Sequence, residues 1–373
     1  MKKETKCIHS GTLEDGITGG INTPVFPSSA FGYLDRQDVP YPRYFNTPNQ
    51  KAVVEKLCAL EGGQDGVLFA SGMAAMSTAI LAFAGGGDHV VMMDELYGGT
   101  HAFATEEFQR LGISYTFAAT DSGSIANAIR ENTKVLILES PTNPLLGVID
   151  IRGVAESARK RNVITIIDNT FATPINQNPM KYGIDVVVHS GTKYLAGHSD
   201  LCCGLAVSTR ENAERIRAVA KHLGGSVNAL TCYLLERSLK TLAIRVGRQC
   251  ENAGRIAKFL EGHGKIKKVH YPGLPGSPYH GLAKSQMEGF GAIVSFEPDV
   301  DAGRLVKGFS IIKPAVSLGG IETTICSPAA TSHAKISAGE RKRIGIGDSL
   351  LRLSVGIEHA DDLLEDIEGA LRN

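Results

Sequence analysis

Lys193 lies among small and hydroxylated residues in the stretch HSGTKYLAGHSD, directly after the apolar run at residues 185–188. A lysine ammonium at the end of a buried strand is costly unless its charge is needed or its pKa is altered. A surface lysine just past a strand end is the simpler interpretation of this stretch taken alone. A chemical role requires partner residues elsewhere in the chain, and several candidates are present.

Three polar clusters follow apolar runs, at points where predicted strands end. They are ESPTNP after residues 135–138, DNT after residues 164–167 and HSGTK after residues 186–188. In open parallel sheets, ligands bind beyond the carboxyl ends of the strands. We therefore expect the three clusters to share one crevice. Its candidate residues are Asn143, Asp168, Ser190, Thr192 and Lys193.

A fourth stretch, ASGMAAM at residues 70–76, is a turn of small residues that opens a predicted helix. The free N–H groups and the dipole of a helix start suit a phosphate group. Pyridoxal phosphate requires a lysine for its Schiff base, an acid at its ring nitrogen and an anchor for its phosphate. The fingerprints of other phosphate sites, GxGxxG opening a helix and GxxxxGK[ST], are absent from the sequence.

The elements that must position these residues alternate along the chain. Apolar runs such as GVLFA, HVVMM, KVLILES and VITIID are separated by helical stretches such as SGMAAMSTAILAF and IRGVAESARKRN. One helix is predicted over residues 101–111. Such alternation predicts an α/β fold whose mostly parallel sheet is covered by helices on both faces.

The length of 373 residues favours two domains over one. Residues 1–45 are rich in Gly, Pro, Ser and Tyr without a clear period, and we predict an extended N-terminal arm there. Residues 46–235 are predicted to form a large cofactor-binding domain. Residues 236–373, where the pattern changes, are predicted to form a smaller C-terminal α+β domain.

Composition restricts the partners of the protein. The 39 basic and 39 acidic residues cancel, so neither nucleic acid nor an anionic membrane is an expected partner, and a small molecule is. The first residues lack the apolar stretch of a secretory signal, and no segment is long and apolar enough to span a bilayer. Seven cysteines without a CxxC pair indicate a reduced, cytoplasmic chain, and the histidines show no metal-ligand spacing, so no metal is expected.

Eight blocks of the sequence, in order, resemble the Cys/Met-metabolism family of pyridoxal-phosphate enzymes, which includes cystathionine γ-synthase, cystathionine β- and γ-lyases and methionine γ-lyase. The blocks are YPRYFNTPNQ, FASGMAA, DELYGGT, ESPTNP, IDNTFATP, HSGTKYLAGHSD, VSLGGIET and LLRLSVGIE. The resemblance covers nearly the whole chain. It implies pyridoxal-phosphate fold type I and the cofactor pyridoxal 5'-phosphate.

The resemblance implies a role for each motif residue around the cofactor ring. Lys193 would be the Schiff-base lysine, and Asp168 would pair with the pyridinium nitrogen. Tyr97 would stack on the ring and act later as an acid or base. Without the motifs, Asp168 could simply cap a turn and Tyr97 could be a packing residue.

The resemblance also implies which groups hold the phosphate. Within one chain these are the backbone N–H groups of Gly72 and Met73 and the hydroxyl groups of Ser190 and Thr192. Tyr41 and Arg43 of the arm would reach the phosphate of a neighbouring subunit, and a guanidinium fork suits a phosphate dianion. Each active site would then need two chains, within a homotetramer that is a dimer of dimers.

An amino-acid substrate is implied to bind through its α-carboxylate. Arg352 in LLRLSVG would clamp this group, helped by Asn143, which is also placed at the cofactor, and by the backbone around Ser317. The simpler interpretation of Arg352 is a strand arginine in an ion pair.

The implied chemistry begins when an amino acid displaces Lys193, which then takes the α-proton, while Tyr97 assists departure of the sulfur group. We predict a carbon–sulfur lyase of the transsulfuration type, which acts by β- or γ-elimination on cystathionine or a related sulfur amino acid. Its products would be a thiol, ammonia and a keto acid. The alternatives are γ-replacement on an O-acylhomoserine and methionine γ-lyase activity. A non-catalytic protein of the same fold is disfavoured because Lys193, Asp168, Tyr97 and Arg352 are all present.

Three departures from the family pattern bear on the substrate. Many cystathionine γ-synthases and γ-lyases have glutamate where this chain has Val316, and an acidic residue where it has Pro40. Both departures remove carboxylates that would hold a distal amino group, so cystathionine stays an open question. Gly99 replaces the cysteine typical of methionine γ-lyases, which disfavours a dedicated methionine enzyme.

Overall fold

Two β-sheets form the framework of the computed structural model, which describes residues 1–334 and 337–372. The larger sheet has seven strands in the order β1-β7-β6-β5-β4-β2-β3. Its strands are β1 (Asp65–Phe69), β2 (His89–Met93), β3 (Ser114–Ala118), β4 (Thr133–Glu139), β5 (Ile164–Asp168), β6 (Val186–Ser190) and β7 (Gly204–Ser208).

The larger sheet is mostly parallel, as the alternation of elements predicts. Strands β3, β2, β4, β5 and β6 pair in parallel, and β7 alone runs against both of its neighbours, β6 and β1. The register places Asp168 at the end of β5 opposite Glu139 of β4 on one side and Val188 of β6 on the other. The carboxyl ends of these three strands therefore meet at one edge of the sheet.

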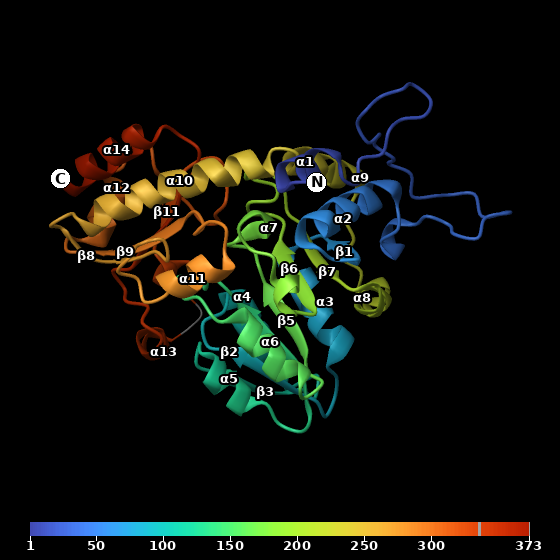
Figure 1. The fold of residues 1–373 in the computed structure, drawn as a ribbon, viewed down its shortest axis with the longest axis horizontal. Helices are drawn as coiled ribbons and strands as arrows, with labels where there is room; N and C mark the ends of the chain where they lie inside the picture. The colour runs from blue at the N-terminus through green and yellow to red at the C-terminus, as the bar shows by residue number, and fades with distance from the viewer. Residues whose placement is uncertain (335–336, 373) are drawn as a thin grey trace.

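Helices cover both faces of the larger sheet (Figure 1). They are α2 (Pro48–Glu61), α3 (Gly72–Phe83), α4 (Gly98–Glu107), α5 (Ser122–Ala128), α6 (Ile151–Arg159), α7 (Thr173–Asn176) and α8 (Arg210–Leu223). Side chains alternate between the faces of a strand. Leu205 and Val207 of β7 accordingly pack in one apolar cluster with Leu57 of α2, whereas Ala206 packs in another with Ile80 of α3.

The smaller sheet has five strands in the order β10-β11-β12-β9-β8. They are β8 (Ile266–His270), β9 (Ile293–Pro298), β10 (Lys313–Pro314), β11 (Thr324–Cys326) and β12 (Leu351–Ser354). The remaining helices are α9 (Ala229–Leu239), α10 (Leu242–Glu261), α11 (His280–Gln286), α12 (Ala302–Lys307), α13 (Ala338–Arg343) and α14 (Ala360–Arg372), with short 3-10 turns at Pro42–Tyr44, Pro179–Tyr182 and Pro328–Ala330. None of the helices in the described residues is long and apolar enough to cross a membrane.

Helix α10 connects the two sheets. It runs along one side of the molecule, past the larger sheet to the smaller one (Figure 1). Its buried residues Val246 and Ile256 belong to the same apolar cluster as Leu57 of α2 and Phe296 of β9. Because interiors pack at high density, this shared cluster holds the smaller sheet against the larger one.

One helix differs in its bounds from the sequence-based prediction. The helix expected at residues 101–111 is α4, which begins earlier because the N–H groups of Thr100 and His101 already donate to the carbonyl oxygen of Tyr97. The predicted domain boundary at residues 235 and 236 falls inside α9. The three-part division of the chain stays a prediction.

The sequence predicts an extended N-terminal arm, but the first part of this segment is helical. Residues Lys3–His9 form helix α1, whose Cys7 is fully buried. The ammonium group of Lys3 donates to the carbonyl oxygen of Ile175 over 2.7 Å, and that of Lys6 to Ala59 over 2.8 Å. These contacts dock α1 on the body, and only the chain that follows it projects outward (Figure 1).

Candidate active site

A cavity of about 420 Å³ opens at the carboxyl ends of β4, β5 and β6. Nearly all of the residues predicted for the site line it. They are Gly72, Met73, Tyr97, Asn143, Asp168, Ser190, Thr192, Lys193, Ser317 and Arg352. The smaller sheet closes one side, because Arg352 is on β12 and Ser317 lies in the loop before β11. The structure thus brings together motifs that are far apart in the sequence.

Asp168 ends β5 and faces the cavity. One carboxylate oxygen accepts a hydrogen bond from the backbone N–H of Thr170 over 2.9 Å. Burial raises the pKa of Asp168, while hydrogen bonds from Thr170 and the nearby basic side chains of His189 and Lys193 oppose that rise. Asp168 is therefore placed to pair with a cationic group of a ligand at this point of the cavity.

Lys193 lies in the turn after β6, where its backbone N–H donates to the carbonyl oxygen of Ser190 over 3.2 Å. Its Nζ donates to Oγ of Ser317 over 2.7 Å. Burial, reinforced by the charge of Arg352, lowers the pKa of Lys193 to about 8. An amine with this pKa is available as a base or nucleophile near neutral pH.

Arg352 is 3% exposed and holds two neighbours of the cavity together. Its Nη1 donates to Oδ1 of Asn143 over 2.8 Å, and its Nη2 donates to the carbonyl oxygen of Ser317 over 3.2 Å. Its Nε has no hydrogen-bond partner among the described residues. A buried guanidinium with donors to spare suits a carboxylate ligand.

Tyr97 caps the start of α4 and is 42% exposed. Its backbone N–H donates to one oxygen of Glu139 over 2.8 Å, and the N–H of Asn143 donates to the other over 2.9 Å. Burial and the nearby Asp168 raise the pKa of Glu139 well above its usual range. Glu139 also lines the cavity, although we did not predict it from the sequence. The sequence signal that could have identified Glu139 is its place as the first residue of the polar cluster ESPTNP.

The first turn of α3 meets the end of β6. A Cβ atom placed on Gly72 would lie 2.9 Å from Cβ of Ser190, so only glycine allows this close approach. The first N–H groups of a helix have no partners within it, and Gly72 and Met73, in the first turn of α3, line the cavity together with Ser190. This arrangement fits an anion. The hydroxyl of Thr192 instead donates to the carbonyl oxygen of Cys203 over 3.2 Å.

Tyr41 and Arg43 do not line the cavity of their own chain. The Nη1 atom of Arg43 donates to the carbonyl oxygen of Lys221 over 2.8 Å. The guanidinium carbon lies 5.7 Å from the ring centroid of Tyr41 and 5.3 Å from that of Tyr44. Within one chain, these two predicted residues thus lie apart from the others.

Residues 4–372 match the family described as Cys/Met metabolism PLP-dependent enzyme. The chain belongs to this family. It is 42% identical to a cystathionine beta-lyase of Coxiella burnetii, over 99% of this chain and 97% of that protein, and 42% identical to a cystathionine gamma-lyase of Bacillus subtilis, over the whole of both chains. Its structure matches that of a cystathionine gamma-lyase from Lactobacillus plantarum complexed with L-serine, with a TM-score of 0.96 and 38% identity over 100% of this chain and 99% of that one.

As a Cys/Met metabolism enzyme, the chain is a lyase that depends on pyridoxal 5'-phosphate. The residues of the cavity fit this cofactor. The junction of Gly72 and Ser190 offers an anion cradle, Asp168 offers a carboxylate for a cationic ring nitrogen, and Lys193 offers an amine for the aldehyde. When bound, pyridoxal phosphate withdraws electrons from bonds at the α-carbon of an amino acid, which side chains alone cannot do.

Proposed function

We propose that this enzyme is a carbon–sulfur lyase that eliminates a thiol from the β- or γ-carbon of cystathionine or a related sulfur amino acid. The supporting observation is the position of Lys193, whose amine has a pKa of about 8. Both this amine and the guanidinium of Arg352 donate a hydrogen bond to Ser317, which therefore links them. A base beside a carboxylate clamp suits removal of the α-proton from an amino acid. The names of its cystathionine-lyase relatives agree with this reaction.

In the proposed reaction, Arg352 and Asn143 bind the α-carboxylate of the substrate and so fix the α-carbon near Lys193. Nζ of Lys193 accepts the α-proton and, for elimination at the γ-carbon, a β-proton as well. The hydroxyl of Tyr97 donates a proton to the departing sulfur. Each general acid–base step of this kind contributes about 10²–10⁴-fold to the rate.

The cavity rim bears on the choice of substrate. Val316 lines the cavity and is 71% exposed, so it offers an apolar surface where a charged residue would bind a distal amino group. This surface favours shorter substrates such as cysteine or homocysteine over cystathionine. It also keeps open the alternative reaction, in which a thiol displaces the acyloxy group from the γ-carbon of an O-acylhomoserine, and this group leaves as a carboxylate.

Gly99 bears on the methionine alternative. A Cβ atom on Gly99 would lie 2.5 Å from Cε1 of Tyr97, so a side chain here would displace the tyrosine ring. The absence of a side chain therefore allows the observed position of Tyr97. We propose methionine only as a minor substrate.

A substrate panel tests the function directly. Cystathionine, cysteine, homocysteine, methionine and the O-acetyl and O-succinyl esters of homoserine are assayed for keto acid, ammonia and thiol. A lyase releases keto acid and ammonia from at least one sulfur amino acid, together with a thiol or, from cysteine and homocysteine, hydrogen sulfide. Formation of a thioether from an ester and a thiol, without keto acid, would instead establish the replacement reaction.

We further propose that each active site is shared between two chains of a homotetramer. The segment between α1 and α2 exposes large apolar residues that no core of its own covers: Ile17, Ile21, Tyr33 and Leu34. Such a segment is suited to dock on a second copy of the chain. Arg43 and Tyr41, at its end, would then reach the neighbour's phosphate site.

A further inference from the structure

Glu61 is a fully buried carboxylate that the proposed reaction does not use. It is the last residue of α2, where the negative end of the helix dipole disfavours a carboxylate. Its ion-pair partner within the described residues is His189, which is 1% exposed. A buried charge at such a position is costly, so its contacts must compensate for it.

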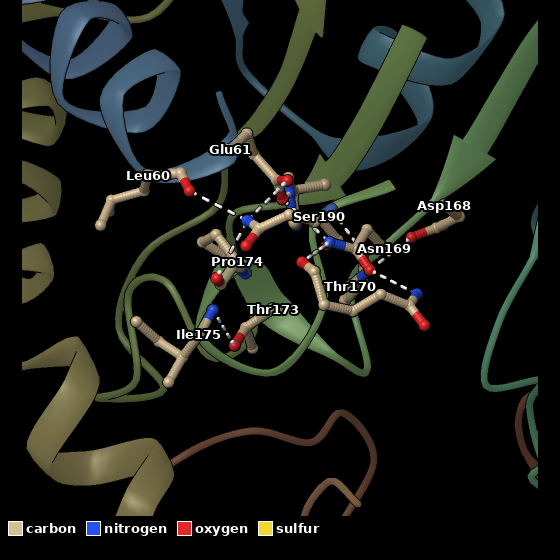
Figure 2. Close-up of polar contacts among 12 residues, drawn as sticks. Leu60, Glu61, Asp168, Asn169, Thr170, Thr173, Pro174, Ile175 and Ser190 are labelled. Atoms are coloured by element: carbon tan, nitrogen blue, oxygen red, sulfur yellow. Dashed lines mark hydrogen bonds and ion pairs between the residues drawn. The ribbon is translucent and has the colours of Figure 1, made fainter. Parts of the chain in front are cut away.

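One oxygen of Glu61 joins the ends of two strands. Oε1 lies 2.6 Å from Nε2 of His189 and accepts a hydrogen bond from Nδ2 of Asn169 over 2.9 Å. His189 directly precedes Ser190, and Asn169 directly follows Asp168. Figure 2 shows Glu61 lying between the end of α2 and these strand ends. Each of the two residues that contact Oε1 of Glu61 is therefore adjacent in sequence to a candidate cofactor ligand.

The same strand ends are also linked to each other. The N–H of Asn169 donates to the carbonyl oxygen of Val188 over 2.9 Å, and the N–H of Ser190 donates to Oγ1 of Thr170 over 2.8 Å. On the far side, Nε2 of Gln177 donates to Oδ1 of Asn169 over 2.9 Å. The position of Asn169, and with it that of Asp168, is thus set from several directions.

The second oxygen of Glu61 faces a further amide. Nδ2 of Asn178 lies 3.5 Å from Oε2 and donates over 2.9 Å to the carbonyl oxygen of Leu60. Among the described residues, the groups that face the Glu61 carboxylate are all side-chain nitrogens. An amide in place of the carboxylate would direct its own N–H hydrogens at one or more of these donors.

We propose that Glu61 is a positioning residue which, through His189 and Asn169, holds Asp168 and Ser190 at the spacing that the cofactor requires. The inference rests on the roles proposed above for Asp168 and Ser190. His189 adds a second effect, because its proximity opposes the rise in the pKa of Asp168 that burial causes. Residues that orient the ligands of a metal ion change its affinity about 10–100-fold, and we expect an effect of this size for the cofactor.

The experiment measures binding of pyridoxal 5'-phosphate to the cofactor-free protein by equilibrium dialysis and by visible absorbance. We expect Glu61→Gln to raise the dissociation constant about tenfold or more. His189→Gln retains an N–H donor toward Glu61, so we expect this variant to bind the cofactor more tightly than His189→Ala does. Glu55→Gln is the matched control, since Glu55 is exposed on the same helix.

Urea unfolding of each variant separates positioning from stability. A merely structural role would lower the unfolding midpoint of Glu61→Gln and leave the dissociation constant and the pH dependence of the visible band unchanged. If Glu61→Gln gave that result while Asp168→Asn and Ser190→Ala bound the cofactor more weakly, Glu61 would have no positioning role. The assignment of Asp168 and Ser190 as cofactor ligands would still hold. Native affinity in all of these variants would overturn both. If Glu61→Gln does not fold, the dissociation constants of the two His189 variants decide. Tighter binding by His189→Gln than by His189→Ala supports the positioning role, and equal binding overturns it.

Discussion

Nζ of Lys193 donates a hydrogen bond to Oγ of Ser317 over 2.7 Å, although Lys193 follows a strand of the larger sheet and Ser317 lies in a loop between strands of the smaller one. Ser317 has a φ of 77°, in the left-handed region that residues other than glycine rarely adopt. Its carbonyl oxygen also accepts the hydrogen bond from Arg352. One strained residue therefore sets the distance between the candidate base and the candidate carboxylate clamp.

Ser317→Gly separates the backbone strain from the hydroxyl contact. Glycine adopts a positive φ without steric penalty, so we expect the unfolding free energy to stay equal or rise by about 1 kcal/mol. Loss of the hydroxyl frees Lys193, and we expect kcat to fall about tenfold. Urea unfolding and steady-state kinetics check the two effects, and native kcat would show that the hydroxyl contact is dispensable.

Lys193→Ala should abolish covalent attachment of the cofactor. We expect turnover to fall by at least about 10²-fold, because the variant lacks the proposed base. Borohydride reduction followed by mass spectrometry of peptides locates the modified lysine in the native enzyme. Recovery of a reduced cofactor adduct on another lysine of the variant would reject the assignment.

The lowered pKa of Lys193 predicts unusual reactivity in the cofactor-free protein. With a pKa of about 8, its amine is largely unprotonated above pH 8, whereas an ordinary lysine requires a pH near 10.4. An amine-acylating reagent should therefore modify Lys193 with a midpoint near pH 8. In Arg352→Gln the midpoint should rise, because removal of the positive charge removes one cause of the shift. Peptide mass spectrometry follows the modification, and an unmoved midpoint would contradict the proposed charge coupling.

Asp168→Asn tests the carboxylate at the end of β5. A neutral amide does not stabilise a positive charge on the ring nitrogen, so we expect exchange of the substrate α-proton to slow by about 10²-fold or more. The cofactor should bind more weakly but remain bound when it is supplied in excess. Exchange is measured by NMR in deuterated water, and a near-native exchange rate would exclude the proposed role.

Arg43→Ala and Lys193→Ala should each be inactive alone and complement each other when mixed. If an active site takes Arg43 from one chain and Lys193 from the other, random pairing restores about a quarter of the native sites. The control is proof of subunit exchange by native mass spectrometry. Background activity in exchanged mixtures would mean that each chain completes its own site.

The strand-end part of the site is determined by the sequence to a large extent. A parallel sheet places the carboxyl ends of its strands along one edge, so apolar runs followed by polar clusters predict that Asp168, Ser190 and Lys193 meet. The small residues before α3 predict a helix start at the same edge. These inferences depend on local periodicity and on a general rule of sheet topology. In the structure, the residues concerned line one cavity.

The contributions of Arg352 and Ser317 to the cavity follow from no local pattern. They lie on or before strands of the smaller sheet, and family motifs alone indicated their place beside Lys193. In the structure, the apolar cluster along α10 sets how the two sheets meet, and that packing brings Arg352 to Asn143.

The contacts of Glu61 were decided by tertiary structure alone. In sequence it is a polar residue at the end of an ordinary helix, and nothing in the spacing connects it with His189. The two meet because α2 packs on the face of the sheet to which His189 points. Periodicity states which side of an element is buried, but the identity of the partner depends on how distant surfaces fit together.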